Sequence, residues 1–221
     1  MTVWVSVEGV EGVGKSHLAV QLAARLDGRC ALAAEITDQA GSSLPGRMIG
    51  VLSSAGDPFL RIGYPLAETL ALIALKVREH EIAGRGPGAP PEMVLEDRGI
   101  DSVAVYQAII VAGAGAPLEQ MLLVMQRIYA TAARWRPLPE MTLLLIDELD
   151  ACIGRFEARL GRAVPPADRA LIARAGELYA YLAASQSGRF AVIDRRQYGE
   201  ADVVARMHLA CLSRLENPCA T

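Results

Sequence analysis

One segment near the start of the chain restricts the fold more than any other feature of the sequence. Residues 9–16 read Gly-Val-Glu-Gly-Val-Gly-Lys-Ser and fit the pattern G-x-x-x-x-G-K-[S/T]. Glycines at this spacing let the backbone curl until its N–H groups point at phosphate oxygens. A helix that follows would present its positive N-terminal end to the same anion. We therefore predict a phosphate-binding loop between a strand and a helix.

The residues of this loop have distinct predicted roles. Lys15 would reach the β- and γ-phosphates of a nucleotide, and the Ser16 hydroxyl would ligate Mg²⁺. The predicted cofactor contacts of the loop and the helix start are Gly9, Val10, Glu11, Gly12, Val13, Gly14, Lys15, Ser16 and His17. A chance match to the pattern is disfavoured, because a strand-like apolar stretch precedes the loop and an amphipathic segment follows it.

Short apolar runs alternate with amphipathic segments along the rest of the chain, which indicates an α/β fold with a mostly parallel sheet. The predicted strands cover residues 3–7, 31–36, 93–96, 141–146 and 190–193. The predicted helices cover residues 15–26, 66–82, a segment from about 102, 118–134, 167–184 and 200–215. Together with the phosphate loop, this order predicts a P-loop NTPase fold: a parallel five-stranded sheet with helices on both faces. Ligands would bind beyond the carboxyl ends of the strands.

Length and composition narrow the functional classes. A chain of 221 residues suits a single domain over residues 1–221. The net charge of −3 argues against nucleic-acid binding through bulk positive charge. No apolar run reaches the ~18 residues that a membrane span needs. None of the four cysteines forms a C-x-x-C pair, so a zinc site is disfavoured and reduced thiols in a cytoplasmic protein are expected.

Three segments stand out together: the loop region at 7–16, the Glu-Asp-Arg stretch at 96–107 with its Ser and Tyr-Gln, and the Pro-Glu-Met-Thr-Leu-Leu-Leu strand at 139–145. In this order and spacing they resemble the thymidylate kinase family of nucleoside monophosphate kinases. The resemblance implies direct phosphoryl transfer from ATP, with Mg²⁺, to a small acceptor molecule. It also implies one P-loop kinase domain with an Arg-rich lid at about 149–165. Family members are commonly dimers, so a homodimer is expected.

The resemblance implies roles for residues outside the loop. Asp97 would accept a proton from the acceptor or organise Mg²⁺ through water. Arg98 would grip the acceptor phosphate or the transferring phosphoryl group; a structural Asp-Arg ion pair is the alternative. Arg195 follows the last strand, where the family places adenine, and would stack on that base; an exposed loop is the alternative. The other residues expected to contact the acceptor are Glu8, Ser102, Tyr106 and Gln107.

The predicted lid is rich in arginine. Arg155, Arg159 and Arg162 follow at i, i+4 and i+7, so we expect them on one helix face. A cationic face over ATP would neutralise the charge that spreads over the transferring oxygens. A solvated helix face with Glu157 as a local partner is the alternative. The family's strand before the lid ends in Asp, but here Ile146 takes that place and Asp147 follows, so the role of Asp147 stays open.

Two segments depart from the family where it recognises its acceptor. Asp38 replaces an arginine that would help to hold the acceptor phosphate, unless the alignment slips and Arg47 lies there instead. Leu72 replaces an aromatic residue that stacks on thymine, and Lys76 replaces an arginine. The carboxylate of Asp38 would repel a phosphate dianion. The ammonium group of Lys76 is a point charge and does not replace the planar guanidinium of an arginine, which donates two parallel hydrogen bonds.

These departures lead us to expect an acceptor other than thymidine monophosphate (dTMP). The expected function is ATP- and Mg²⁺-dependent phosphoryl transfer to a nucleotide, a nucleoside or a related metabolite. Two alternatives stay open: a genuine dTMP kinase, and a nucleotide-binding switch that no longer phosphorylates.

Overall fold

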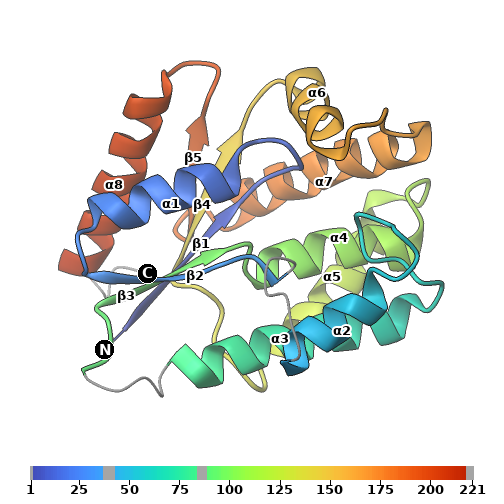
Figure 1. Cartoon of the computed structure of the whole chain (residues 1–221), viewed down its shortest axis with the longest axis horizontal. Coiled ribbons are helices and arrows are strands. Elements are labelled where there is room, and N and C mark those ends of the chain that lie inside the picture. The colour runs from blue at the N-terminus through green and yellow to red at the C-terminus, as the bar shows by residue number, and fades with distance from the viewer. Residues whose placement is uncertain (1, 37–42, 84–88, 218–221) are drawn as a thin grey trace. The chain divides into compact units, whose positions relative to one another are not determined.

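The structure, a computed structural model, describes residues 2–36, 43–83 and 89–217. Within these ranges the chain builds a sheet of five parallel strands in the order β2-β3-β1-β4-β5 (Figure 1). The strands are β1 (Val3–Glu8), β2 (Cys30–Ala33), β3 (Met93–Asp97), β4 (Met141–Ile146) and β5 (Phe190–Asp194). The strands are parallel and β1 lies between β3 and β4. The segments that follow these three strands therefore emerge side by side at one edge of the sheet.

Helices occupy most of the remaining described residues. They are α1 (Lys15–Arg25), α2 (Leu44–Leu52), α3 (Pro65–Ala83), α4 (Ile100–Ala112), α5 (Leu118–Ala132), α6 (Leu149–Leu160), α7 (Pro166–Ser185) and α8 (Glu200–Glu216). Among the helices of the described ranges, none combines the length and the apolar character that crossing a membrane requires.

The chain divides into two compact units. Unit 1 consists of Met1–Ala33, Pro91–Gly99 and Pro139–Thr221, and it holds the sheet with α1, α6, α7 and α8. Unit 2 consists of Ala34–Pro90 and Ile100–Leu138, and it holds α2 to α5. The chain therefore leaves unit 1 directly after the carboxyl end of β3, at Gly99.

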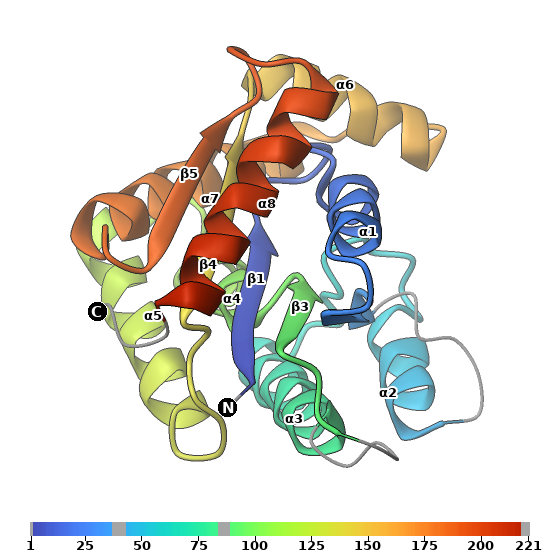
Figure 2. The same ribbon diagram turned by 90° about the vertical axis from the view of Figure 1, so that its left-hand side faces the viewer.

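Helices cover both faces of the sheet in unit 1, as predicted. Alternate side chains of a strand point to opposite faces, and Val3, Val5 and Val7 of β1 lie in a buried apolar core with residues of α1 and α8. Figure 2 shows α8 lying along this side of the strands. Glu8 points to the other face, where Tyr179 of α7 donates a hydrogen bond to its carboxylate.

Unit 2 is a helical layer built around α4. Ten successive residues of α4, Ile100 to Ile109, are buried, and α3 and α5 both pack against this helix. The burial on all sides matches the apolar composition of the helix. The polar residues Asp101, Ser102 and Gln107 of α4 are among these buried residues.

The predicted strands and helices are confirmed, with differences at their ends. β2 ends at Ala33 rather than at residue 36, and the helix after β3 begins at Ile100 rather than near 102. Helix α2 was not predicted, because its first turn contains Pro45 and Gly46. Proline needs no N–H partner in a first turn, and Ser43 caps the helix by accepting a hydrogen bond from the Gly46 N–H at 3.3 Å.

Candidate phosphate-transfer site

The loop between β1 and α1 has the backbone that its glycines predict. Gly9, Gly12 and Gly14 have φ angles of 142°, 73° and 95°, a region that side chains other than glycine rarely adopt. The loop ends where α1 begins at Lys15. Its N–H groups and the helix N-terminus thus converge at the carboxyl edge of the sheet, which is the arrangement that binds phosphate.

The Lys15 side chain folds back over this loop. Its Nζ atom donates to the carbonyl oxygens of Gly9 and Val10, at 2.8 Å each, and only 4% of the residue is exposed. The ammonium group is therefore held above the loop interior, where the phosphates of a nucleotide would approach it.

Helix α6 is pressed against the same loop. A Cβ atom built on Gly12 would lie 1.9 Å from the Cys152 carbonyl oxygen, so no other residue fits there without a shift. Arg155 Nε donates to the Gly12 carbonyl at 2.7 Å, and Arg155 Nη2 lies 2.5 Å from an Asp147 carboxylate oxygen. The first part of the predicted lid thus places an arginine on the phosphate loop.

Glu11 gathers positive charge at the centre of the site. Its carboxylate pairs with Arg98, which follows β3, and with Arg159 of α6, whose Nη2 lies at 3.3 Å. Burial by itself raises the pKa of Glu11, but Arg98, Lys15 and Arg159 lower it more, and the result is a pKa of about 2. Glu11 is therefore ionised at neutral pH and holds two arginines beside the loop.

The turn after β3 carries Asp97 and Arg98. Asp97 is 3% exposed. Arg98 has a φ angle of 63°, and its N–H donates to the Val7 carbonyl at 3.2 Å. Glu8, which is fully buried, accepts a hydrogen bond from the Gly99 N–H at 2.7 Å and another from the Tyr179 hydroxyl at 3.0 Å. The carboxyl ends of β1 and β3 are thus tied together at this turn.

Arg195 and His17 border the loop on the side of β5 and α8. Arg195 Nη1 donates to the Val13 carbonyl, and its guanidinium lies over Gly14. The exposed His17 ring contacts Glu200 at 2.9 Å and Gln21 at 2.8 Å. Arg195 therefore touches the phosphate loop, whereas His17 points outward to the start of α8.

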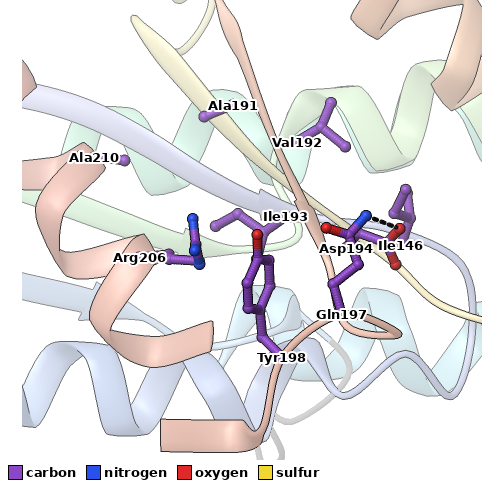
Figure 3. A pocket seen from close by; sticks show the side chains of 9 residues that line it. All are labelled: Ile146, Ala191, Val192, Ile193, Asp194, Gln197, Tyr198, Arg206 and Ala210. Atoms are coloured by element: carbon purple, nitrogen blue, oxygen red, sulfur yellow. Dashed lines mark hydrogen bonds between the residues drawn. The ribbon is translucent and has the colours of Figure 1, made fainter. Parts of the chain in front are cut away.

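A cavity of about 440 Å³ lies at the outer edge of the sheet, between β5 and α8 (Figure 3). Its lining comprises Ile146, Ala191, Val192, Ile193, Asp194, Gln197, Tyr198, Arg206 and Ala210. The Arg206 guanidinium lies 3.6 Å from the centre of the Tyr198 ring. No residue of 9–16 belongs to this lining, so the cavity is separate from the phosphate loop.

The residues expected to recognise the acceptor base lie together in unit 2, on α3 and α4. Lys76 Nζ lies 2.7 Å from a Glu79 carboxylate oxygen, and the two side chains are only 2% and 5% exposed. Thr69 donates to the Gln107 side-chain carbonyl at 2.9 Å. The Thr69–Gln107 bond joins the two helices, whereas the Lys76–Glu79 pair lies within α3, and both expected residues, Lys76 and Gln107, are buried.

An aromatic pair lies in the same unit. The Phe59 and Tyr106 rings stack with their centres 5.9 Å apart. The Arg61 guanidinium lies over the Phe59 ring, 5.3 Å from its centre. Leu72 and Ser102 are each 7% exposed. Tyr106 therefore has an aromatic neighbour from the segment before α3, although Leu72 itself offers no ring.

Three curated relatives match this chain over most of its length. All three are named thymidylate kinase. The relative from Nitratidesulfovibrio vulgaris is 31% identical over 209 residues, which cover 91% of this chain and 88% of the relative. The chain belongs to the thymidylate kinase family. The relative from Cereibacter sphaeroides is 30% identical over 199 residues, with 86% of each chain covered. The relative from Trichlorobacter lovleyi is 27% identical over 223 residues, which cover 97% of this chain and 99% of the relative.

No family model matches the sequence. Membership of the thymidylate kinase family therefore rests on these pairwise similarities and agrees with the parallel sheet and phosphate loop. The chain is a P-loop nucleotide kinase, a nucleotide-binding phosphotransferase.

The prediction that three lid arginines share one helix face is wrong for Arg162. Helix α6 ends at Leu160, and Gly161 adopts a φ angle of 65° that stops the helix. Arg155 and Arg159 lie within α6 and reach the loop, whereas Arg162 lies beyond the helix and is exposed. The spacing of the arginines was read as helical although a glycine interrupts it.

Two contacts were not anticipated from the sequence. Asp147 pairs with Arg155, although its role was left open, and Tyr179 reaches Glu8 from a helix far along the chain. No local pattern marks Tyr179, because it lies among apolar residues of α7. Asp38 lies outside the described residues, whereas Arg47 belongs to α2.

Proposed function

We propose that this kinase transfers the terminal phosphoryl group of ATP to a nucleotide or nucleoside-like acceptor other than dTMP. The observation that supports the acceptor claim best is the Lys76–Glu79 ion pair, 2.7 Å long and buried in unit 2. A lysine that pairs with a buried carboxylate is costly to withdraw for a ligand, because the charge–charge interaction between the two buried groups would be lost. An arginine in the same place would keep further donors for a base.

The donor half of the proposal rests on the phosphate loop. Lys15 contacts the β- and γ-phosphates of ATP, and the loop N–H groups from Gly9 to Ser16 bind the remaining phosphate oxygens. Arg195 completes the nucleotide site on the side of the base, whereas His17 belongs to it only through its backbone at the start of α1, because its ring points outward to Glu200. The contacts of Lys15 and Arg195 with loop carbonyls support these positions.

Ser16 and Asp97 are the proposed ligands of Mg²⁺. A hydroxyl and a carboxylate are the oxygen ligands that Mg²⁺ takes, together with substrate phosphates. In the described part of the chain, no group of three or more His, Cys, Asp or Glu could hold a metal. The ion would be held by these two side chains together with the nucleotide phosphates, whose charge it would neutralise.

Transfer then depends on charge at the loop. Arg98, Arg155 and Arg159 neutralise the negative charge that develops on the transferring oxygens. As the alternative to its role at Mg²⁺, Asp97 accepts the proton of the attacking acceptor group. Arg162, which lies outside α6, would act only if the segment after the helix folds over ATP. We propose that residues 149–165 form the lid of a single kinase domain, with α6 as its rigid part.

The acceptor half of the proposal concerns the residues that the resemblance assigns to the acceptor. Glu8, Leu72, Lys76, Arg98, Ser102, Tyr106 and Gln107 are the proposed acceptor residues, and Asp38 is a further one. Leu72 cannot stack on a pyrimidine as a ring does. With Lys76 engaged by Glu79, the chain has lost the two contacts by which the family is expected to read thymine.

A panel of nucleoside monophosphates and nucleosides, each supplied with ATP and Mg²⁺ and followed by ADP release, tests the proposal. We expect the best acceptor to exceed dTMP by at least about 100-fold in kcat/KM, since a site that hydrogen-bonds its substrate rejects a ligand without those groups by up to about 10⁴- to 10⁵-fold. A double variant, Leu72→Phe with Lys76→Arg, should raise kcat/KM for dTMP. Equal turnover of dTMP and the best acceptor would identify a genuine dTMP kinase. Tight ATP binding without any phosphorylated acceptor would identify a switch.

We also propose that the kinase forms a homodimer through the outer face of α3. Leu66 and Leu70 on this helix are 67% and 59% exposed, and Tyr64 before it is 69% exposed. Apolar side chains of this size are commonly covered at interfaces. Light scattering of the purified protein should give twice the mass of 23.6 kDa, and Leu70→Asp should reduce it to the monomer mass.

A further inference from the structure

Arg98 adopts a backbone conformation that its side chain does not favour. Its φ angle is 63°, in the left-handed region, and only three non-glycine residues of the described chain have a positive φ. Such conformations cost free energy and persist where surrounding contacts determine them. The turn that carries Arg98 must therefore be held by specific partners.

Two hydrogen bonds from the backbone of this turn to β1 hold it in place. The Arg98 N–H donates to the Val7 carbonyl at 3.2 Å, and the Gly99 N–H donates to Glu8 Oε1 at 2.7 Å. Glu8 is fully buried, so its carboxylate is shielded from bulk solvent. The bond to Glu8 fixes the residue directly after Arg98.

Tyr179 supplies a donor to the other oxygen of the same carboxylate. Its hydroxyl lies 3.0 Å from Glu8 Oε2, and the tyrosine is 1% exposed in the middle of α7. Each oxygen of Glu8 thus accepts a hydrogen bond from the protein. Buried polar groups are held by such hydrogen bonds, so Tyr179 helps to fix the direction in which the Glu8 side chain faces the turn.

The turn also has little room to move. A Cβ atom on Gly99 would lie 2.8 Å from Ser6 Cβ and 3.0 Å from Glu96 Oε2. Gly99 is the last residue of unit 1 before the chain enters unit 2. Because its N–H is bonded to Glu8, a small rotation of the Glu8 carboxylate would displace the backbone beside Arg98.

We infer that Tyr179 is a positioning residue for phosphoryl transfer, which acts through Glu8 and the Gly99 N–H to set the direction of the Arg98 guanidinium. The Arg98 side chain then meets Glu11 of the phosphate loop. This inference rests on the proposed role of Arg98 in gripping phosphate. It assigns Glu8 to the support of this turn, in addition to the acceptor contact implied by resemblance.

Tyr179→Phe tests the link, because it removes the hydroxyl and keeps the ring that packs in α7. Without this donor the carboxylate is less well oriented, so we expect exchange of the Gly99 amide hydrogen to become about tenfold faster by NMR. Tyr181→Phe is the matched control, since Tyr181 lies on the same helix and is 42% exposed. It should leave Gly99 exchange unchanged. Unchanged exchange in Tyr179→Phe would overturn the inference, and this measurement needs no substrate.

Kinetics test the consequence for Arg98. With the best acceptor of the panel, Tyr179→Phe should raise the KM for the acceptor about tenfold, the scale of one lost hydrogen bond to a charged group, with the KM for ATP unchanged. In an Arg98→Ala background the same change should have no further effect on kcat/KM. An equal loss in both backgrounds would overturn the inference. Faster exchange with unchanged acceptor kinetics would instead contradict the proposed function of Arg98.

Discussion

Arg155 is paired with Asp147 at 2.5 Å while its Nε donates to the Gly12 carbonyl at 2.7 Å. The pair joins the segment after β4, helix α6 and the phosphate loop within unit 1. Asp147 is 13% exposed and Arg155 is 44% exposed. The guanidinium is therefore oriented by its partner but stays accessible to an incoming phosphate.

The first prediction concerns this pair. Asp147→Asn removes the charge that orients Arg155, so we expect kcat to fall about tenfold, because a misdirected arginine stabilises the transferring phosphoryl group less well. Steady-state ADP release at saturating ATP measures it. Glu177→Gln is the control, because it breaks an Arg174 pair on α7 whose glutamate is 54% exposed. Equal effects of the two substitutions would count against a role for Asp147.

The second prediction concerns Lys15. Lys15→Met keeps an unbranched side chain but removes the ammonium group that lies above the loop. We expect kcat to fall at least about 100-fold, as for the loss of one preorganised donor to developing charge. Calorimetric titration with ATP, alongside the rate, separates weaker binding from slower transfer. Retention of a wild-type rate would contradict the phosphate-loop assignment.

The third prediction compares two glycines. Gly12→Ala would place a Cβ atom 1.9 Å from the Cys152 carbonyl at a φ angle of 73°, so we expect α6 to shift and ATP affinity to fall. Gly154→Ala, within α6, meets nothing within 4 Å and should stabilise the protein by up to about 1 kcal/mol, since alanine favours the helix. Thermal unfolding and ATP titration of both variants provide the check. Similar behaviour of the two would show that the contact at Gly12 is not restrictive.

The fourth prediction concerns pH. The pKa of Glu11 falls from 4.5 to about 2 on folding, so between these values the unfolded chain binds more protons than the native one. The stability that Glu11 contributes is fully present above pH 4.5 and is lost as the pH falls toward 2. The shift corresponds to about 3 kcal/mol, as an order of magnitude.

Urea unfolding from pH 7 to pH 3 measures this contribution. Glu11→Gln should lower the free energy of unfolding at pH 7 and flatten its dependence on pH below 4.5. Glu92→Gln is the control, because the pKa of Glu92 is also lowered, by its hydrogen bond with Arg29, but that exposed pair contributes little. A Glu11→Gln variant with the wild-type pH slope would refute the prediction.

Local patterns made much of the fold predictable. The phosphate loop depends on glycine spacing over eight residues, and β4 was predicted over residues 141–146 as it is observed. The predictions were wrong where local signals compete. The Pro45-Gly46 pair argued against a helix where α2 forms, and Gly161 ends α6 before Arg162. In both places the backbone preference of a single residue outweighed the pattern around it.

The sequence by itself determined the donor side of this protein: the loop at 9–16, the order of strands and helices, and the family. These features depend on residues close together in the chain. Only the tertiary structure decided which side chains support the site, because their partners are distant in sequence. Tyr179 meets Glu8 across 171 positions and Arg159 meets Glu11 across 148. The buried Lys76–Glu79 pair is short in sequence, yet only the packing of unit 2 shows that it is removed from water and therefore costly to break.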